Sequence, residues 1–244
     1  MKILCIFHAS FEKLGYIEIW ANKNNHIIRK VNPYRGETLP KIDDFDFLII
    51  MGGPQSTLQI ENAPYLLDEI EFIKEAIQMD KRVLGICLGA QLVAEALGAK
   101  TEISPHHEVG MYLVELLDDS RSDPVFRHFP SKFEAMHWHH DMPGLPEEAA
   151  LLARSEGCPR QAFRYGDRVY GLQFHFEMTE ILLTGMVENC LGDLIEKGKY
   201  VRPVKEILET DCSEINLKLE SILEYLANLP HEINVELNKS ASVA

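Results

Sequence analysis

Hydrophobic residues follow two alternating patterns in the first part of the chain, up to Ala99. Short apolar runs, typical of buried strands, occur at residues 2–7, 26–31, 45–51 and 82–86. Stretches with apolar residues at helical spacing alternate with them, at residues 11–22, 64–79 and 88–97. Gly98 is of the residue type that usually ends a helix in a left-handed conformation. Strands that alternate with helices favour right-handed crossovers, so we predict a mostly parallel sheet.

The pattern changes after Ala99, where apolar residues alternate with polar ones in segments that lie closer together. These segments predict strands at residues 111–117, 133–139, 149–154, 161–164 and 168–174. Closely spaced strands suit antiparallel pairing, because antiparallel neighbours need only a short connection. We therefore expect an α/β fold, a three-layer α/β/α sandwich with a mostly parallel central sheet and an antiparallel extension.

The end of the chain predicts one more helix, at residues 213–229. Its apolar stripe consists of Ile215, Leu219, Ile222, Leu226 and Leu229. Such a stripe either packs on the core of its own domain, which we favour, or docks on a partner. We divide the chain into a domain at residues 1–200 and a C-terminal helical extension at residues 201–244, packed on the same domain. We expect the polar tail after Pro230 to fray.

The composition is that of an ordinary globular protein and limits the partners. Of 244 residues, 46% are hydrophobic and 25% charged, enough for one sizeable α/β core. A formal net charge of −14 opposes binding to nucleic acid, whose phosphates need clustered Lys and Arg. We expect no membrane segment, because no apolar run approaches spanning length. The five cysteines lack paired spacing, which indicates a reducing, cytoplasmic setting.

Cys87 lies where a predicted strand turns into a predicted helix. A free cysteine more often packs as a small core residue than takes part in catalysis. Here, however, Gly85 and Gly89 flank it in a G-x-C-x-G pattern, the arrangement of a nucleophile elbow with sulfur in place of oxygen. The turn is tight, so a side chain at either glycine would block it or the substrate. Helix N-termini and nearby imidazolium ions favour the reactive thiolate, and we predict that Cys87 is a nucleophile.

A nucleophilic thiol needs a histidine, and the segment G-L-Q-F-H-F-E offers one. His175 and Glu177 stand two residues apart at the end of a predicted strand, so both side chains point to the same side. The carboxylate can then orient the ring while the other ring nitrogen faces the thiol. Alone, such a pair is more often a surface ion pair. Together with an elbow, it predicts a catalytic base and its orienting partner.

A third candidate element follows the apolar run at residues 45–51, which leads into Gly52-Gly53-Pro54. On its own this tripeptide signals only a turn. Sites in α/β sheets lie beyond the carboxyl ends of strands, and glycines there allow backbone N–H groups to point into the site. We predict that the amides of Gly53 and of Leu88, the residue after the nucleophile, form an oxyanion hole.

The histidine-rich stretch M-H-W-H-H-D offers an alternative, because clustered histidines bind metal ions. His106 and His107 are further candidates for such a cluster. Along a strand, however, His137 and His139 share one face while His140 lies on the other, and no complete metal-binding spacing occurs. We predict a polar loop beside the site, with no metal and no cofactor.

Three motifs in this order, M-G-G-P-Q-S, L-G-I-C-L-G-A-Q and G-L-Q-F-H-F-E, resemble those of the class I glutamine amidotransferase family. The likeness is greatest to the glutaminase domain of GMP synthetase and its stand-alone relatives, and it spans roughly residues 2–194. The resemblance implies a flavodoxin-like fold and a triad of Cys87, His175 and Glu177. The triad would hydrolyse the side-chain amide of glutamine through a γ-glutamyl thioester and release ammonia.

The resemblance also implies contacts with the substrate. Gln91 follows the elbow, where the family's glutamine helps to hold the substrate. The stretch H-H-D resembles the family's His-Gly-Asp, which makes His140 and Asp141 neighbours of the substrate. Gly52, next to the oxyanion residue, and Gly110 in H-E-V-G complete the predicted contacts.

Two departures from the family pattern bear on function. Phe176 follows the histidine, where the family often has proline, and we expect no ATP-using second domain in 244 residues without a P-loop motif. We therefore expect a subunit or stand-alone enzyme that passes ammonia to a separate acceptor enzyme. One alternative is a peptidase that cleaves γ-glutamyl peptides or conjugates. The other is a non-catalytic regulatory protein whose Cys87 responds to redox conditions.

Overall fold

A computed structural model describes residues 1–195 and 198–230, and its centre is one sheet of ten strands. The order along the sheet is β10-β5-β7-β8-β9-β4-β3-β1-β2, with β6 paired to β5. The parallel half consists of β1 (Lys2–Ile6), β2 (Ile27–Val31), β3 (Phe47–Ile50), β4 (Arg82–Ile86) and β9 (Val169–Leu172). This half confirms the mostly parallel sheet that the alternating pattern predicts.

The other half of the sheet is antiparallel except for one edge strand. Its antiparallel neighbours, in spatial order, are β6 (Lys132–Met142), β5 (Glu102–Leu116), β7 (Ala150–Ser155), β8 (Ala162–Tyr165) and β9. The two-residue strand β10 (Tyr200–Val201) pairs with β5 in parallel. These pairings confirm the antiparallel extension.

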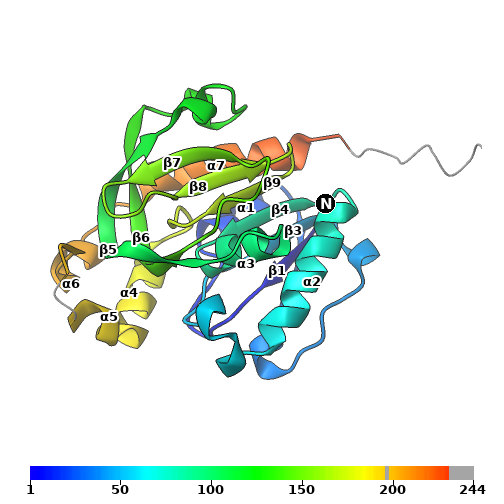
Figure 1. Ribbon diagram of the computed structural model, residues 1–244, viewed down its shortest axis with the longest axis horizontal. Helices are drawn as coiled ribbons and strands as arrows, with labels where there is room; N and C mark the ends of the chain where they lie inside the picture. Colours follow the sequence, from blue (N-terminus) through cyan, green and yellow to red (C-terminus); the bar gives the residue numbers. More distant parts are fainter. Residues whose placement is uncertain (196–197, 231–244) are drawn as a thin grey trace, which may run out of the picture.

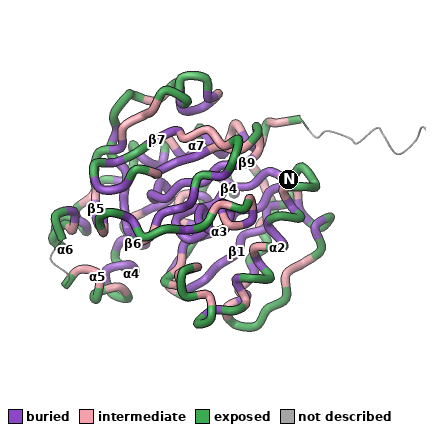
Figure 2. Tube along the Cα trace, viewed as in Figure 1, coloured by how far each residue is buried: buried purple, intermediate pink, exposed green. Residues whose placement is uncertain are grey.

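Helices cover both faces of the sheet (Figure 1). One face carries α2 (Tyr65–Gln78) and α3 (Leu88–Ala96), and the other carries α1 (Tyr16–Lys23), α4 (Glu180–Asn189) and α7 (Ser213–Asn228). In β3, Phe47 and Ile49 join the core of α1 and α7, whereas Leu48 and Ile50 join the core of α2 and α3. Successive side chains of a strand point to opposite faces, so this apolar strand fills two cores. The fold is therefore a three-layer α/β/α sandwich, and burial is continuous along its central strands (Figure 2).

Helix α1 begins at Tyr16, later than the apolar pattern predicts. Gly15 has a φ of +52°, and the backbone N–H of Tyr16 donates to the carbonyl of Glu177 at 2.9 Å. A Cβ atom at position 15 would lie 2.1 Å from that carbonyl oxygen, so only glycine permits the approach. The residues just before Gly15 therefore form a loop held against the segment that follows β9, not the first turns of the helix.

The pattern also misses the start of β5 and three helices. Strand β5 begins at Glu102, before the predicted start at residue 111, because its first part is largely polar and lacks apolar alternation. Helices α5 (Leu191–Ile195) and α6 (Val204–Leu208) have five residues each, too few to show a helical period, and α4 was also not predicted.

Helix α7 packs on the core shared with α1 and the sheet. Its buried face includes Ile215, Leu219 and Ile222. The side-chain amide of Asn216 donates to the carbonyls of Phe176 and Met178, at 2.7 and 2.9 Å. The helix therefore contacts the backbone on both sides of Glu177. The predicted tail, from residue 231 onward, lies outside the described residues.

None of the helices in the described residues is long and apolar enough to cross a membrane.

Candidate active site

Cys87 stands in a strained turn between β4 and α3. Its φ of +53° and ψ of −110° are unusual for a residue with a side chain, and strain of this kind gathers at functional sites. A Cβ atom on Gly85 would lie 2.4 Å from the carbonyl oxygen of Gly89. One on Gly89 would lie 2.1 Å from the carbonyl oxygen of Ile50. The two flanking glycines thus allow strand and helix to meet closely enough to form the elbow.

His175 and Glu177 form a buried pair directly after β9. The ring Nδ1 lies 2.6 Å from Glu177 Oε1, and Nε2 has no nitrogen or oxygen partner among the described residues, which leaves it to the Cys87 thiol. The His175 backbone N–H donates to the carbonyl of Met136 at 2.7 Å, which ties the segment to β6. Burial opposes a charged ring, but the charges of Glu177 and Cys87 outweigh it and raise the pKa of His175 well above its ordinary value. The ring is therefore set up to carry a proton.

The Gly52–Gly53 turn follows β3 at the same edge of the sheet. A Cβ atom on Gly52 would lie 3.3 Å from His175 Cε1 and 2.8 Å from Glu12 Oε2. No hydrogen bond among the described residues uses the backbone N–H of Gly53 or of Leu88. Both amides are thus available to a ligand, as an oxyanion hole requires.

A cavity of about 200 Å³ connects these elements. It is lined by seven of the predicted site residues: Gly53, Cys87, Leu88, Gln91, His140, Asp141 and His175. Gly52 and Glu177 are not part of the lining but contact residues that are. Gly52 lies against Glu12 and His175, and Glu177 binds the ring of His175.

The structure does not bring Gly110 to the cavity. It lies in β5 opposite His137, with a φ of +114°. A Cβ atom there would lie 2.3 Å from Arg202 Cγ, so the backbone at this position packs under the arginine next to β10. The glycine is explained by this packing.

Gln91 and Asp141 are held in place by neighbouring side chains. The Gln91 amide donates to Gln173 Oε1 at 3.0 Å, and Gln91 is almost fully buried in the first turn of α3. The Ser56 hydroxyl donates to Asp141 Oδ2 at 2.5 Å, which joins the loop after β3 to the end of β6. These contacts fix two of the polar groups that face the cavity.

Several residues that line the cavity were not predicted. Glu12, Trp138, Met186, Cys190 and Asp193 are among them. Trp138 presents its carbonyl to the Cys87 thiol, which donates to it at 3.6 Å. Its indole donates to Asp193 Oδ2 at 2.8 Å. Glu12 follows β1 at the same sheet edge as the other candidates, but the apolar pattern placed it inside the helix predicted at residues 11–22.

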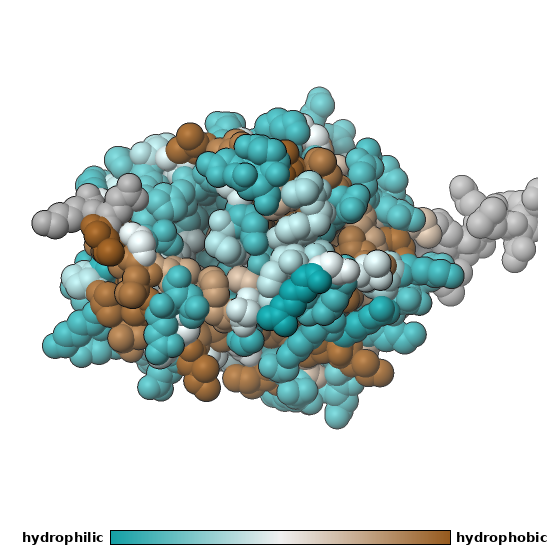
Figure 3. Space-filling model, turned by 90° about the horizontal axis from the view of Figure 1, so that it is seen from below, coloured by the Kyte–Doolittle hydropathy of each residue, from teal (hydrophilic) through white to brown (hydrophobic). Residues whose placement is uncertain are grey.

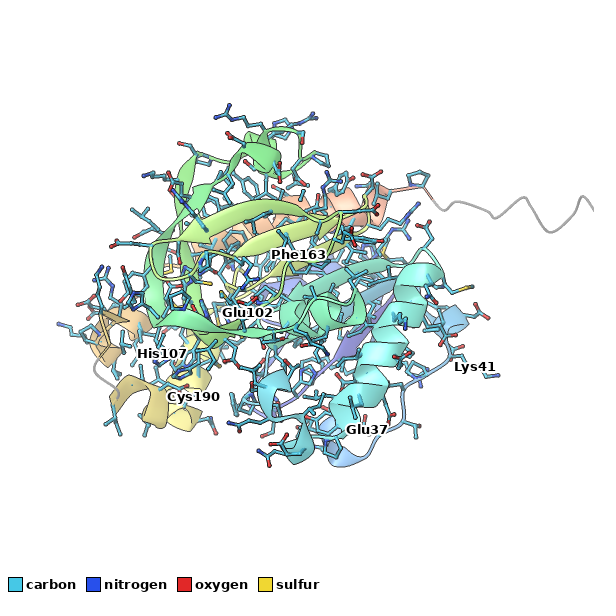
Figure 4. All side chains as sticks on the ribbon, viewed as in Figure 1. Glu37, Lys41, Glu102, His107, Phe163 and Cys190 are labelled. Atoms are coloured by element: carbon cyan, nitrogen blue, oxygen red, sulfur yellow. The ribbon has the colours of Figure 1, made fainter. Side chains whose placement is uncertain are left out.

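The wall formed by α4 and α5 also carries apolar side chains at the surface. Cys190, between these helices, and His107, on β5, lie on the same side of the molecule (Figure 4). Ile181, Leu191 and Ile195 are 82%, 53% and 78% exposed. In the view from below, a group of hydrophobic residues, coloured brown, lies on the left of the molecule (Figure 3).

Two groups of side chains have donor atoms close enough to hold a metal ion. One group consists of His107, His140 and Asp193, and the other of Glu108, His137 and His139. Within each group the donor atoms lie within 4.8 Å of one another. As predicted, His137 and His139 share a face and His140 lies apart from them. In the buried group the amide nitrogen of Gln161 lies between the donors, 2.7 Å from Glu108 Oε2 and 3.2 and 3.3 Å from the two rings. An amide has two N–H groups, so the chain itself supplies a donor for two of these three acceptors.

Comparison with known proteins supports the resemblance of the motifs. Residues 8–191 match the family described as glutamine amidotransferase class-I. The chain belongs to this family. The glutamine amidotransferase-like protein YfeJ of Salmonella typhimurium is 39% identical over 232 residues, which cover 93% of this chain and 97% of YfeJ. The crystal structure of a glutamine amidotransferase from Thermotoga maritima covers 94% of this chain with a TM-score of 0.85 and 29% identity, and 99% of that structure is matched.

This class I glutamine amidotransferase corresponds to only part of a GMP synthase. The GMP synthase [glutamine-hydrolyzing] of Thermosipho africanus is 34% identical over 152 residues, which cover 62% of this chain but 27% of that enzyme. The likeness to such synthases therefore concerns about a quarter of their length.

Proposed function

We propose that this protein hydrolyses the side-chain amide of glutamine, with Cys87, His175 and Glu177 as its triad. The observation that carries the proposal is that His175, held by Glu177 at 2.6 Å, lines the same cavity as Cys87. Membership of the class I family supports the same assignment.

The reaction follows from the roles that such a triad allows. The Cys87 thiolate attacks the amide carbon, and the C–O π electrons move to the oxygen, which the N–H groups of Gly53 and Leu88 stabilise. His175 gives its proton to the amide nitrogen, the C–N bond breaks and ammonia leaves. His175 then takes a proton from water as the water oxygen attacks the thioester carbon. The C–S bond breaks, glutamate leaves after its carboxyl group loses a proton to solvent, and the Cys87 thiolate remains beside protonated His175. Glu177 orients the ring and stabilises its charged form throughout.

The charges around the cavity support an amino acid with a free ammonium group. Three carboxyl groups line it, those of Glu12, Asp141 and Asp193, and the described lining contains no Lys or Arg. We infer that carboxylates bind the α-ammonium group of glutamine, with Gln91 and His140 nearby. At about 200 Å³ the cavity is smaller than the roughly 300–1,000 Å³ typical of drug-sized ligands, which favours a small substrate.

The γ-glutamyl peptidase is the second candidate, because part of the cavity is apolar. Phe11, Trp138 and Met186 line it, and ammonia as leaving group needs none of them. Apolar side chains suit an amine that carries a carbon chain, and the covalent steps at Cys87 would be the same.

The destination of the ammonia is part of the proposal. The resemblance to GMP synthases supports a separate enzyme as the ammonia acceptor. All five cysteines are free, which supports a reducing, cytoplasmic setting.

The test is to incubate the purified protein with glutamine and, separately, with γ-glutamyl dipeptides, and to follow the release of glutamate and amine. Cys87→Ala serves as the control. Release from glutamine that disappears in the variant is the expected result. If kcat/KM is higher for every dipeptide than for glutamine, the assignment as a γ-glutamyl peptidase takes the place of the assignment as a glutaminase. Release that persists in Cys87→Ala would reject the triad.

A further inference from the structure

A second histidine–carboxylate pair lies beneath the Gly52–Gly53 turn. His8 follows β1 and Glu69 lies in α2, and both side chains are fully buried. The ring Nδ1 of His8 lies 2.9 Å from the carbonyl oxygen of Gly52, and Nε2 lies 2.9 Å from Glu69 Oε2. The glutaminase mechanism assigns no step to either residue.

The partners of the ring determine its hydrogens. A carbonyl oxygen only accepts hydrogen bonds, so Nδ1 of His8 carries a hydrogen and donates it to Gly52. The Glu69 carboxylate likewise accepts from Nε2. Burial opposes the charge that results, but the hydrogen bond and charge of Glu69 raise the pKa of His8 above its ordinary value. Both nitrogens of the His8 ring are thus engaged, Nδ1 as a donor to the Gly52 carbonyl and Nε2 with the Glu69 carboxyl group.

The hydrogen bond to Gly52 has a consequence for Gly53. The Gly52 carbonyl and the Gly53 N–H belong to the same peptide unit, which is planar and trans, so they point in opposite directions. A carbonyl held by His8 therefore turns the Gly53 N–H away from His8. Gly53 lines the cavity together with Cys87, and no described hydrogen bond uses its N–H.

The turn needs such a constraint because glycine is the most flexible residue. With glycine on both sides, rotation of the peptide between Gly52 and Gly53 meets little steric resistance. Rotation by half a turn would replace the N–H with the carbonyl, whose partial negative charge would repel an oxyanion. His8 also lies close against the turn, since a Cβ atom on Gly53 would lie 2.4 Å from His8 Cβ.

We propose that His8 and Glu69 are positioning residues that hold the Gly52–Gly53 peptide with the Gly53 N–H directed at the oxyanion. This inference deepens the proposed function and rests on it. His8 holds the peptide, Glu69 holds His8, and Glu69 is itself a buried residue of α2. Neither side chain touches the substrate.

The variants separate this role from a general effect on folding. Asn places a side-chain N–H near the position of a histidine Nδ1, so His8→Asn retains the donor to Gly52, whereas His8→Leu removes it. Glu69→Gln removes the carboxylate, and Glu71→Gln, an exposed carboxylate of the same helix, is its control. Thermal unfolding checks that each variant folds.

Activity and thiol reactivity give different expected results. His8→Leu should lower kcat for glutamine by about 10²–10³-fold, the usual effect of losing an oxyanion donor, with KM changed little. His8→Asn should recover most of this loss, and Glu71→Gln should match the wild type. The rate at which iodoacetamide alkylates Cys87 should stay within about twofold, because alkylation needs the thiolate and no oxyanion hole. A normal kcat in His8→Leu, or an equal loss in His8→Asn, overturns the proposal.

Two further measurements keep the proposal testable if glutamine is not the substrate. Acylation of Cys87 by p-nitrophenyl acetate also forms an oxyanion. The acylation rate should therefore fall most in His8→Leu, less in His8→Asn and not at all in Glu71→Gln, as for kcat with glutamine. Wild-type protein that reacts with the ester but not with glutamine would refute the glutaminase and still test His8. Two-bond ¹H–¹⁵N NMR, assigned with His8→Asn, should show both His8 nitrogens protonated at pH 7. An unprotonated Nδ1 would overturn the proposal whatever the substrate.

Discussion

The two buried histidine–carboxylate pairs next to Gly52 differ above all in the partner of the ring nitrogen that does not face the carboxylate. His8 uses both nitrogens, one for Glu69 and one for the Gly52 carbonyl. His175 uses Nδ1 for Glu177, and its Nε2 has no nitrogen or oxygen partner among the described residues and is left to the Cys87 thiol. A ring with both nitrogens bonded can only hold its surroundings in place. A ring with one nitrogen left can exchange a proton with a substrate.

The comparison shows that the residue types alone do not identify a catalytic pair. Both histidines are buried, both have a carboxylate within hydrogen-bond distance, and the pKa of both is raised. What distinguishes them is geometry, since only His175 shares the cavity with Cys87. The same substitution at the two positions therefore has different expected effects.

The largest difference is expected between His175→Asn and His8→Asn. Asparagine cannot carry a proton between thiol and leaving group, so His175→Asn should lower kcat by about 10⁴-fold or more. His8→Asn should remain within about tenfold of the wild type, because an N–H still reaches the Gly52 carbonyl. Steady-state release of glutamate measures both. Comparable losses in the two variants would remove the distinction between a catalytic and a positioning pair.

Substitution of the two carboxylates, Glu177 and Glu69, should lower kcat in the same order as substitution of the two histidines, but with a smaller difference. Glu177→Gln replaces the acceptor that fixes the His175 ring and stabilises its charge, so we expect kcat to fall by about 10³-fold. Glu69→Gln leaves the donor to Gly52 in place and should lower kcat by about tenfold. The pH profile of kcat/KM separates them further, since only Glu177→Gln should shift the limb that reports His175. A shift in Glu69→Gln instead would mean that Glu69 acts on the base.

Stability should depend on pH through the His8 pair. Because its pKa is higher in the folded than in the unfolded state, the contribution of His8 is fully present below the ordinary value of 6.5. It is lost as the pH rises through the folded pKa. His8→Asn leaves buried Glu69 without its partner and should reduce the free energy of unfolding by about 3 kcal/mol at pH 6. The double variant His8→Asn/Glu69→Gln removes both titrating groups, so its difference from the wild type in urea unfolding should shrink as the pH rises through the folded pKa of His8. A difference that grows with pH would contradict this linkage.

The sequence was sufficient for those parts of the site whose signal is local. The G-x-C-x-G turn and the His-x-Glu spacing each need only a few residues, and strand geometry places their side chains. The parallel half of the sheet was predictable for the same reason, since strands such as β3 are continuous apolar runs with two buried faces.

The positioning pair was not predictable, because it joins residues far apart in the chain. Nothing in the sequence connects His8 with Glu69, and Glu69 looks like one more charge on an amphipathic helix. Glu12 was hidden differently, since the apolar pattern placed it inside a helix that begins later, at Tyr16. Gly110 is the opposite case: the resemblance implied a substrate contact from a short motif, and the structure places the glycine against Arg202, outside the cavity lining.

Glu12 provides the smallest expected effect and extends the comparison to a carboxyl group without a histidine partner. It lines the cavity, and burial raises its pKa to about 7. If its ionised form binds the α-ammonium group of glutamine, Glu12→Gln should raise KM by about tenfold with little change in kcat, the usual cost of a lost charged hydrogen bond. In the wild type, KM should rise as the pH falls below about 7, because the carboxyl group then becomes neutral. Glu18→Gln, on the exposed face of α1, should change neither value. A fall in kcat without a change in KM would instead place Glu12 among the groups that act on the leaving amine beside His175.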